Sequence, residues 1–352
     1  MKIFYAVQAT GNGHISRAME MLPYLEQYGT VDIFLSGANS TLQLNAPVKY
    51  RSKGVCFFYT NTGGLNYIDT IKGFAPLRVL REARDLPVEK YDLVINDFEC
   101  ITSLACSFKK VPSVNFGHQA SFQSDKVPRP AKKNPIGEWV LHNYARASQY
   151  IGLHFNCYDH FILPPVIKKD IWQAEPKNKG HITVYLPSYS DEIVCNYFSQ
   201  LKDFRFEVFS KEIKQPVLQK NILLTPVNKD AFNTSMINCT GIITSAGFET
   251  PAEALFLGKK ILAIPIKGQY EQLCNAAALE KMGVSCIDAV DKNFSPAFNN
   301  WMNDEKKITL SSNHSTESII SFMMSHSIKR KNYEEDLSYP GFSFCYQRII
   351  PK

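Results

Sequence analysis

The chain has 352 residues, 45% of them hydrophobic, and a formal net charge of +6. This length is enough to bury two cores, so we expect two domains. The mild positive charge suits an anionic nucleotide ligand or an anionic membrane surface, but it is too weak to indicate nucleic-acid binding. The nine cysteines form no CxxC pair, which argues against a zinc site and fits a reducing compartment.

Hydropathy along the chain predicts a soluble, cytoplasmic protein. No apolar segment reaches the roughly 18 residues that a membrane-spanning helix needs. The first residues, MKIFYAVQATGNGH, lack the apolar region of a signal peptide.

The first predicted strand, KIFYAV, leads through the loop at 11–14 (GNGH) into an amphipathic helix. The loop therefore lies at the carboxyl edge of a parallel sheet, where α/β proteins bind their ligands. Its glycines are similar to a degenerate dinucleotide fingerprint. The acidic residue expected about 20 residues later is missing, however, because the second strand ends at Ser36-Gly37. A nicotinamide cofactor is disfavoured.

Two further segments of the first half carry polar residues at strand ends or in loops. VPSVNFGHQASF places His118 and Gln119 after a strand, and we interpret them as acceptor-side residues, with simple packing as the alternative. The segment 124–139 is rich in proline and basic residues. A solvated loop is its simpler interpretation, and a site for an anionic acceptor or lipid headgroups is the alternative.

A proline pair marks the boundary between the predicted domains. Pro164-Pro165 follow the strand HFIL and precede a stretch of mixed charge, which is typical of an interdomain linker. HITVYLP then opens a second parallel sheet, and its strand runs into Ser188 and Ser190 before the next predicted helix.

The most informative stretch is 241–283. The strand GIIT stops at the small-residue turn 245–247 and feeds a helix, whose free N–H groups and dipole favour an anion such as phosphate. Six polar side chains nearby have no evident structural role: Glu249, Glu253, Gln269, Glu271, Gln272 and Asn275. Carboxylates can accept hydrogen bonds from ribose hydroxyls, and an acidic-amide pair suits a polyhydroxy ring. Solvated helix ends are the alternative for any one of them.

The motifs S-A-G-F-E-T-x-x-E-A (245–254) and A-I-P-x-x-G-Q-Y-E-Q-x-x-N-A (263–276) resemble the donor signature of GT-B glycosyltransferases. That superfamily includes the peptidoglycan lipid-intermediate N-acetylglucosaminyltransferase and the UDP-glycosyltransferases. The resemblance implies an α/β architecture of two Rossmann-like, doubly wound domains facing across a cleft. We expect an acceptor-side domain at 1–163, a linker at 164–180, a donor-binding domain at 181–330, and a tail at 331–352 that docks on the first domain.

The resemblance also assigns roles in donor binding. The second glutamate of the motif, here Glu253, contacts the ribose, the small-residue turn binds the diphosphate, and Glu271-Gln272 hold the sugar. Thr244 stands where a basic residue is common, so the diphosphate charge must be balanced by helix dipoles or by a lysine such as Lys267. The full predicted donor set is Gly11, Asn12, Gly13, Ser188, Ser190, Ser245, Gly247, Phe248, Glu249, Thr250, Glu253, Gln269, Glu271 and Gln272.

His14 is the predicted general base, because a neutral imidazole can take a proton from an acceptor hydroxyl near physiological pH. A structural, capping histidine is the alternative. The resembled families carry a histidine in this first loop, and in many members an aspartate at the end of a later strand holds it. Asp97 follows the apolar run LVIN and precedes Phe98, so it fits that position. Asp92 starts the same strand at the wrong edge, whereas Glu99 is a closer competitor.

The predicted reaction is inverting, metal-independent transfer from a nucleotide sugar, with UDP favoured, to a hydroxyl acceptor. A lipid-linked or cell-envelope glycan is one candidate acceptor, which would bring the cytoplasmic protein to the inner face of the plasma membrane as a peripheral contact. We expect no cofactor, no metal and no nucleic-acid partner. The alternatives are a nucleotide-sugar 2-epimerase on the same fold and a non-catalytic nucleotide-sugar-binding protein.

Overall fold

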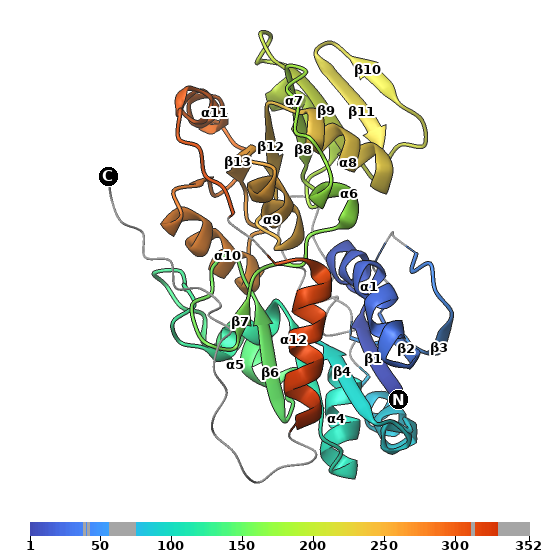
Figure 1. The fold of residues 1–352 in the computed structure, drawn as a ribbon. Coiled ribbons are helices and arrows are strands. Elements are labelled where there is room, and N and C mark those ends of the chain that lie inside the picture. Colours follow the sequence, from blue (N-terminus) through green and yellow to red (C-terminus); the bar gives the residue numbers. More distant parts are fainter. Residues whose placement is uncertain (38–39, 41–42, 56–74, 311–313, 330–352) are drawn as a thin grey trace.

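A computed structural model describes residues 1–37, 40, 43–55, 75–310 and 314–329 of the chain. It divides into two halves, each built on a seven-stranded sheet (Figure 1). The first half contains β1 (Lys2–Gln8), α1 (Asn12–Leu25), β2 (Thr30–Ser36), β3 (Val48–Ser52), α3 (Pro76–Asp85), β4 (Leu93–Asp97), α4 (Cys100–Lys109), β5 (Val114–Gly117), α5 (Pro135–Asn143), β6 (Gln149–Leu153) and β7 (Ile162–Leu163).

The strands of the first sheet run in the order β3-β2-β1-β4-β5-β6-β7, and every neighbouring pair is parallel. β1 is buried along its length after Lys2, which explains its continuous apolar run. The strand order reverses between β1 and β4. Ligands of such sheets bind outside the carboxyl ends of the strands at this switch point.

The second half repeats this plan. It contains β8 (His181–Tyr185), α7 (Asp191–Phe198), β9 (Arg205–Ser210), β10 (Val217–Gln219), β11 (Ile222–Pro226), α8 (Lys229–Asn238), β12 (Gly241–Thr244), α9 (Glu249–Phe256), β13 (Lys260–Ala263), α10 (Tyr270–Lys281), β14 (Ser285–Cys286) and α11 (Phe294–Asn303). The order is β10-β11-β9-β8-β12-β13-β14, with only β10 antiparallel to its neighbour, and it reverses between β8 and β12. The prediction of two doubly wound α/β domains is confirmed.

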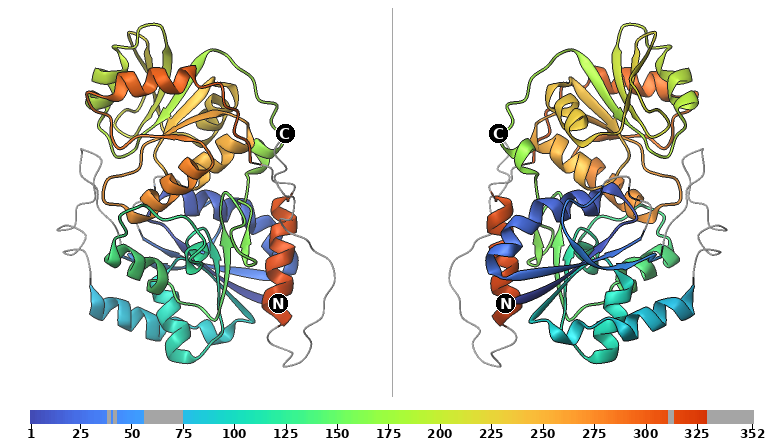
Figure 2. Two further views of the ribbon diagram at one scale, coloured as in Figure 1. Left: turned by 90° about the vertical axis from the view of Figure 1, so that its left-hand side faces the viewer. Right: turned by 90° about the vertical axis from the view of Figure 1, so that its right-hand side faces the viewer.

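The chain passes from the first half to the second between β7 and β8, a segment that includes the short helix α6 (Lys169–Trp172). It returns with α12 (Thr316–Lys329), which lies beside α1 (Figures 1 and 2). We expected 181–330 to form one domain, and α12 corrects that boundary. Its apolar side chains Ile319, Ile320 and Met323 are fully buried in the core that α1 shares. The predicted docking of 331–352 lies outside the described residues.

The two halves also meet where α5 packs against α10. The Tyr270 hydroxyl donates to Glu138 Oε1 at 2.5 Å, and Arg129 holds the same oxygen at 2.8 Å. A Cβ on Gly137 would come within 2.4 Å of the Tyr270 ring, so this close approach needs a glycine. Over the described ranges, the chain has no helix with the length and apolarity to cross a bilayer.

Candidate active site

A cavity of about 620 Å³ lies where the carboxyl ends of the two sheets face each other. Most of the predicted site residues line it: Gly11, Asn12, Gly13, His14, His118, Gln119, Ser188, Ser245, Gly247, Phe248, Glu249, Thr250, Gln269, Glu271 and Gln272. Asp97 is fully buried behind His14. Glu253 lines a smaller adjoining cavity, and Ser190 lines neither. Residues far apart in the sequence are therefore brought together as the resemblance implied.

Three helices begin at the larger cavity without a capping side chain. The residues before the first turns of α1, α9 and α10 are Gly11, Phe248 and Gln269, which all line the cavity and provide no side-chain cap. The first N–H groups of a helix need a partner and attract negative charge. An anion such as a diphosphate can supply that partner from the cavity.

Two predicted or competing residues have structural roles instead. Ser190 caps α7, with its hydroxyl accepting from the Ile193 N–H at 3.5 Å, so its expected contact with the donor has no support in its position. Glu99 caps α4 by accepting from the Ile101 and Thr102 N–H groups at 2.9 and 2.6 Å. Its carboxylate is thereby committed to a helix N-terminus, which removes Glu99 as a competitor of Asp97.

The expected contact between His14 and Asp97 is present. His14 Nδ1 is 2.9 Å from Asp97 Oδ1. Burial acts to raise the pKa of Asp97, but the positive charges of Arg17 and His14 outweigh it and hold that pKa below its usual range. Asp97 is therefore an ionised carboxylate that fixes the ring of His14. The catalytic role of the pair stays a prediction.

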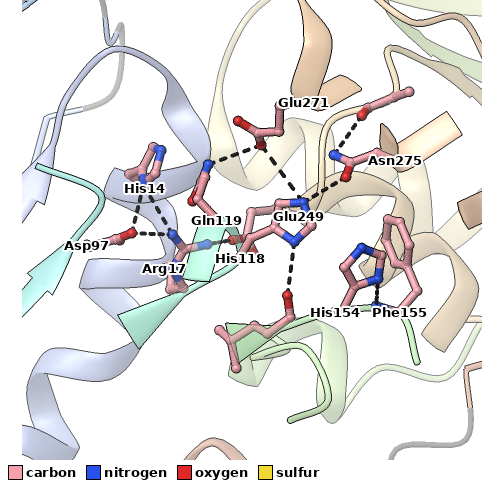
Figure 3. A network of polar contacts seen from close by, with 12 residues as sticks. His14, Arg17, Asp97, His118, Gln119, His154, Phe155, Glu249, Glu271 and Asn275 are labelled. Atoms are coloured by element: carbon pink, nitrogen blue, oxygen red, sulfur yellow. Dashed lines mark hydrogen bonds and ion pairs between the residues drawn. The ribbon is translucent and has the colours of Figure 1, made fainter. Parts of the chain in front are cut away.

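Arg17 is a site residue that the sequence did not predict. Its Nη2 donates to Asp97 Oδ1 at 2.6 Å and lies 3.1 Å from His14 Nδ1, while its Nη1 forms an ion pair with Glu249 of the other half (Figure 3). The side chain is only 2% exposed. One signal in the sequence could have indicated Arg17. It lies three residues after His14, so the two share a helix face, and the other residues on that face are apolar.

His118 and Gln119, expected on the acceptor side, lie in the contact between the halves. The His118 ring stacks on Phe248 with centroids 4.0 Å apart. Its Nε2 is 2.7 Å from Asn275 Oδ1 (Figure 3). Gln119 donates to Glu271 Oε1 at 3.1 Å. The other His118 nitrogen contacts a backbone carbonyl, and burial lowers the pKa of this histidine. His118 thus packs and orders the interface.

Several buried polar atoms around the cavities lack a hydrogen-bond partner among the described residues: Gln119 Oε1, Thr244 Oγ1, Gln269 Oε1, Asn233 Nδ2 and Glu253 Oε1. Such atoms are rare in folded proteins because leaving them unpaired costs about 1–3 kcal/mol each. A polar ligand in these two spaces can supply the missing partners.

The smaller cavity, of about 80 Å³, adjoins the larger one and shares lining residues with it. Glu253, with 2% of its side chain exposed, pairs through Oε2 with Lys168 Nζ of the linker at 3.0 Å. Burial raises the pKa of Glu253 to about 7, although the charge of Lys168 opposes this. Tyr185 and Phe232 form an aromatic wall with ring centroids 5.6 Å apart. The sequence did not predict Lys168.

The lysine that lines the larger cavity is Lys211 and not the suggested Lys267. Lys211 follows β9 and lines the cavity, whereas Lys267 does not. Burial lowers the pKa of Lys211.

Gln272, expected to hold the sugar, uses its Oε1 to accept from the Ile266 N–H at 2.9 Å. Within the described parts of the chain, no three His, Cys, Asp or Glu side chains gather as metal ligands would.

Residues 1–298 match a protein-family model described as glycosyl transferase family 1. The chain belongs to this family. It is therefore a glycosyltransferase, and the enzyme prediction is confirmed. Among curated proteins, none matches the sequence.

Solved structures of other glycosyltransferases share the fold. They include SnogD from Streptomyces nogalater (13% identity, 93% of this chain and 99% of that one, TM-score 0.51) and MurG from Acinetobacter baumannii (14%, 92% and 99%, 0.53). UGT89C1 from Arabidopsis thaliana in complex with UDP is similar at 11% identity, covering 93% of this chain and 94% of that one, with a TM-score of 0.55. These likenesses show the GT-B fold that the donor motifs predicted.

Proposed function

We propose that this glycosyltransferase transfers a sugar from a UDP-sugar to a hydroxyl acceptor, with inversion and without a metal ion. The observation that carries the proposal is the position of His14, which lines the same cavity as three uncapped helix starts. A candidate base and a site for an anion are thus joined in one space between the two halves.

The donor is proposed to lie across both cavities. The diphosphate rests against the turn 245–247 and the first turn of α9, with Lys211 balancing its charge. The nucleoside enters the smaller cavity, where Glu253 Oε1 has no partner in the described part of the chain and accepts from ribose hydroxyls. The sugar reaches Gln269 and Glu271. The UDP complex of UGT89C1 supports uracil as the base.

The proposed reaction is a single displacement. His14 takes the proton of the acceptor hydroxyl as its oxygen attacks the anomeric carbon, and the bond to the diphosphate breaks on the opposite face. The carboxylates of Asp97 and Glu249 carry two negative charges, and the Arg17 guanidinium that pairs with both carries one positive charge. Protonation of His14 completes the balance, which stabilises the imidazolium. The leaving diphosphate gains charge in the transition state, where helix N–H groups and Lys211 stabilise it.

The first test is binding of UDP, GDP, TDP, CDP and ADP by thermal shift, with Glu253→Ala and the exposed-site control Glu305→Ala. We expect stabilisation by UDP that is lost in Glu253→Ala and kept in Glu305→Ala. No shift with any nucleotide would overturn the donor site.

Turnover of the UDP-sugar then separates the reaction classes. We expect His14→Ala to keep UDP binding and lose transfer, with the product carrying the inverted anomeric configuration by NMR. A changed sugar released without any acceptor would instead show an epimerase. Binding without turnover, unaffected by His14→Ala, would show a non-catalytic protein.

We also propose that α5 contacts an anionic membrane, which suits a lipid-linked acceptor. Ile136 and Trp139 are 75% and 63% exposed and lie three residues apart on this helix, and Lys132 and Lys133 precede it. Apolar side chains beside lysines favour a surface with acidic headgroups, at about 1 kcal/mol per lysine. Arg129, in contrast, turns inward to Glu138.

This contact is tested by co-sedimentation with vesicles. We expect binding to phosphatidylglycerol vesicles and little to phosphatidylcholine vesicles. The double variant Ile136→Ser/Trp139→Ser should lose it, and Leu218→Ser should not, because Leu218 is 73% exposed but lies on β10 of the other half. Equal sedimentation of all variants would refute the proposed surface.

A further inference from the structure

Arg17 is the side chain that connects the candidate base to the donor-binding half. It reaches Asp97 and the neighbourhood of His14 with Nη2, and Glu249 on α9 with Nη1 (Figure 3). We propose that Arg17 is a positioning residue that makes the alignment of His14 depend on the docking of α9. The inference rests on the proposed function, because it concerns how the base is prepared for that reaction.

The geometry at Asp97 makes His14 sensitive to Arg17. Both Arg17 Nη2, at 2.6 Å, and His14 Nδ1, at 2.9 Å, contact the same oxygen, Oδ1. The other oxygen, Oδ2, has no hydrogen-bond partner among the described residues. A Cβ on Gly117 would come 2.8 Å from Oδ1, so backbone encloses the group. The carboxylate is therefore held on one side by Arg17, and a shift of the guanidinium changes the contact that orients His14.

The second terminal nitrogen of Arg17, Nη1, contacts the donor-binding half through Glu249. Glu249 is the first residue of α9 and follows the turn 245–247, where the diphosphate is proposed to bind. Gly13 allows this approach of α9 to α1, since a Cβ there would stand 3.2 Å from Glu249 Cγ. A diphosphate beside Glu249 adds negative charge next to its carboxylate, and Arg17 is the buried cation that balances it. Donor binding and the orientation of Asp97 thus act on the same guanidinium.

The alignment of His14 therefore requires that α9 is docked against α1. When α9 is displaced, Arg17 loses Glu249 and the Asp97–His14 contact loses its support. The base is fully aligned only when the donor half is docked, which limits premature activation of water. A purely structural ion pair would affect stability without this effect on catalysis.

Three variants separate these roles: Arg17→Lys, Glu249→Gln and the double variant. The matched control is Tyr270→Phe, which removes another hydrogen bond between the halves without touching the base. For each protein we would measure UDP affinity by calorimetry, stability by urea unfolding, and kcat and KM for the UDP-sugar across pH. Glu249→Gln keeps the shape of the side chain, so it tests the idea even if Arg17→Lys unfolds.

We expect Arg17→Lys to bind UDP within about threefold of the wild type, and both single variants to lose about tenfold or more in kcat, with a changed pH profile. The double variant should lose no more kcat than the worse single variant, because both break one connection. Tyr270→Phe should lower stability and leave the pH profile unchanged. Independent kcat losses that multiply, or unchanged pH profiles in active variants, would overturn the role of Arg17. Failure of the wild type to bind UDP or turn over would instead overturn the proposed function.

Discussion

Replacing Glu253 by glutamine probes the nucleoside site most directly. Glu253 is almost fully buried, pairs with Lys168 through Oε2 at 3.0 Å, and leaves Oε1 unpartnered among the described residues. A hydrogen bond that involves a charged group contributes about 1.5–3 kcal/mol. Loss of the carboxylate should therefore weaken UDP binding by about 10- to 100-fold. Lys168 keeps a second partner, Asn233 Oδ1 at 3.2 Å, so the variant should remain folded.

The same variant should change the pH dependence of stability. The pKa of Glu253 is raised from 4.5 to about 7 in the folded protein, chiefly by burial. Between these values the folded state holds a proton that the unfolded state has released, so the free energy of unfolding falls as pH rises through this window. The fall is on the order of 3 kcal/mol for a shift of this size. Glu253→Gln should abolish it.

Calorimetric titration with UDP at pH 8 and urea unfolding at pH 5, 6 and 7 measure both effects. Glu305→Gln, an exposed site in the same half, serves as the matched control. A dissociation constant for UDP within about threefold of the wild type would refute the ribose contact. An unchanged slope of stability against pH would refute the assignment of a proton to Glu253.

Three further predictions follow from other contacts. Asp97→Asn should lower kcat by about 10²- to 10⁴-fold while leaving UDP affinity unchanged, because it removes the charge that orients His14 and not a donor contact; turnover and calorimetry test this. Lys211→Met should weaken UDP by about tenfold but leave uridine unaffected, and the difference should shrink at high salt, which salt-dependent titrations would show. Gly137→Ala should destabilise the protein by about 1–3 kcal/mol in urea, because its Cβ would meet the Tyr270 ring at 2.4 Å. Equal stability of Gly137→Ala and wild type would contradict the tight α5–α10 contact.

The sequence predicted the features that are encoded locally. Buried parallel strands appear as short apolar runs, and the turns that follow them carry glycine or small hydroxyl residues, so the ends of β1, β8 and β12 were located correctly. Once the fold was recognised, the carboxyl ends of β1 and β4 had to be neighbours. The contact of His14 with Asp97 follows from that register, in which Val7 pairs with Asp97.

Contacts between the halves could not be predicted in this way. The pair Arg17–Glu249 joins residues more than 80 positions apart whose proximity depends on how two separate sheets face each other, and Lys168–Glu253 depends on the path of the linker. No local pattern encodes that geometry. The packing of α12 on the first half was not predicted for a similar reason. An apolar face on a helix indicates that the helix is buried, but it does not indicate which element it packs against.

The double passage of the chain determines how the molecule can open. One crossing lies between β7 and β8 and the other between α11 and α12. The chain between β7 and β8 and the helix α12 lie on the same side of the molecule, opposite α5 (Figure 2). A single tether would allow the halves to twist freely, whereas two tethers restrict them to rocking about one fixed edge. The packing of α5 against α10, which includes the hydrogen bond from Tyr270 to Glu138, lies away from these two crossings. A separation of the halves about the two crossings would therefore break this hydrogen bond.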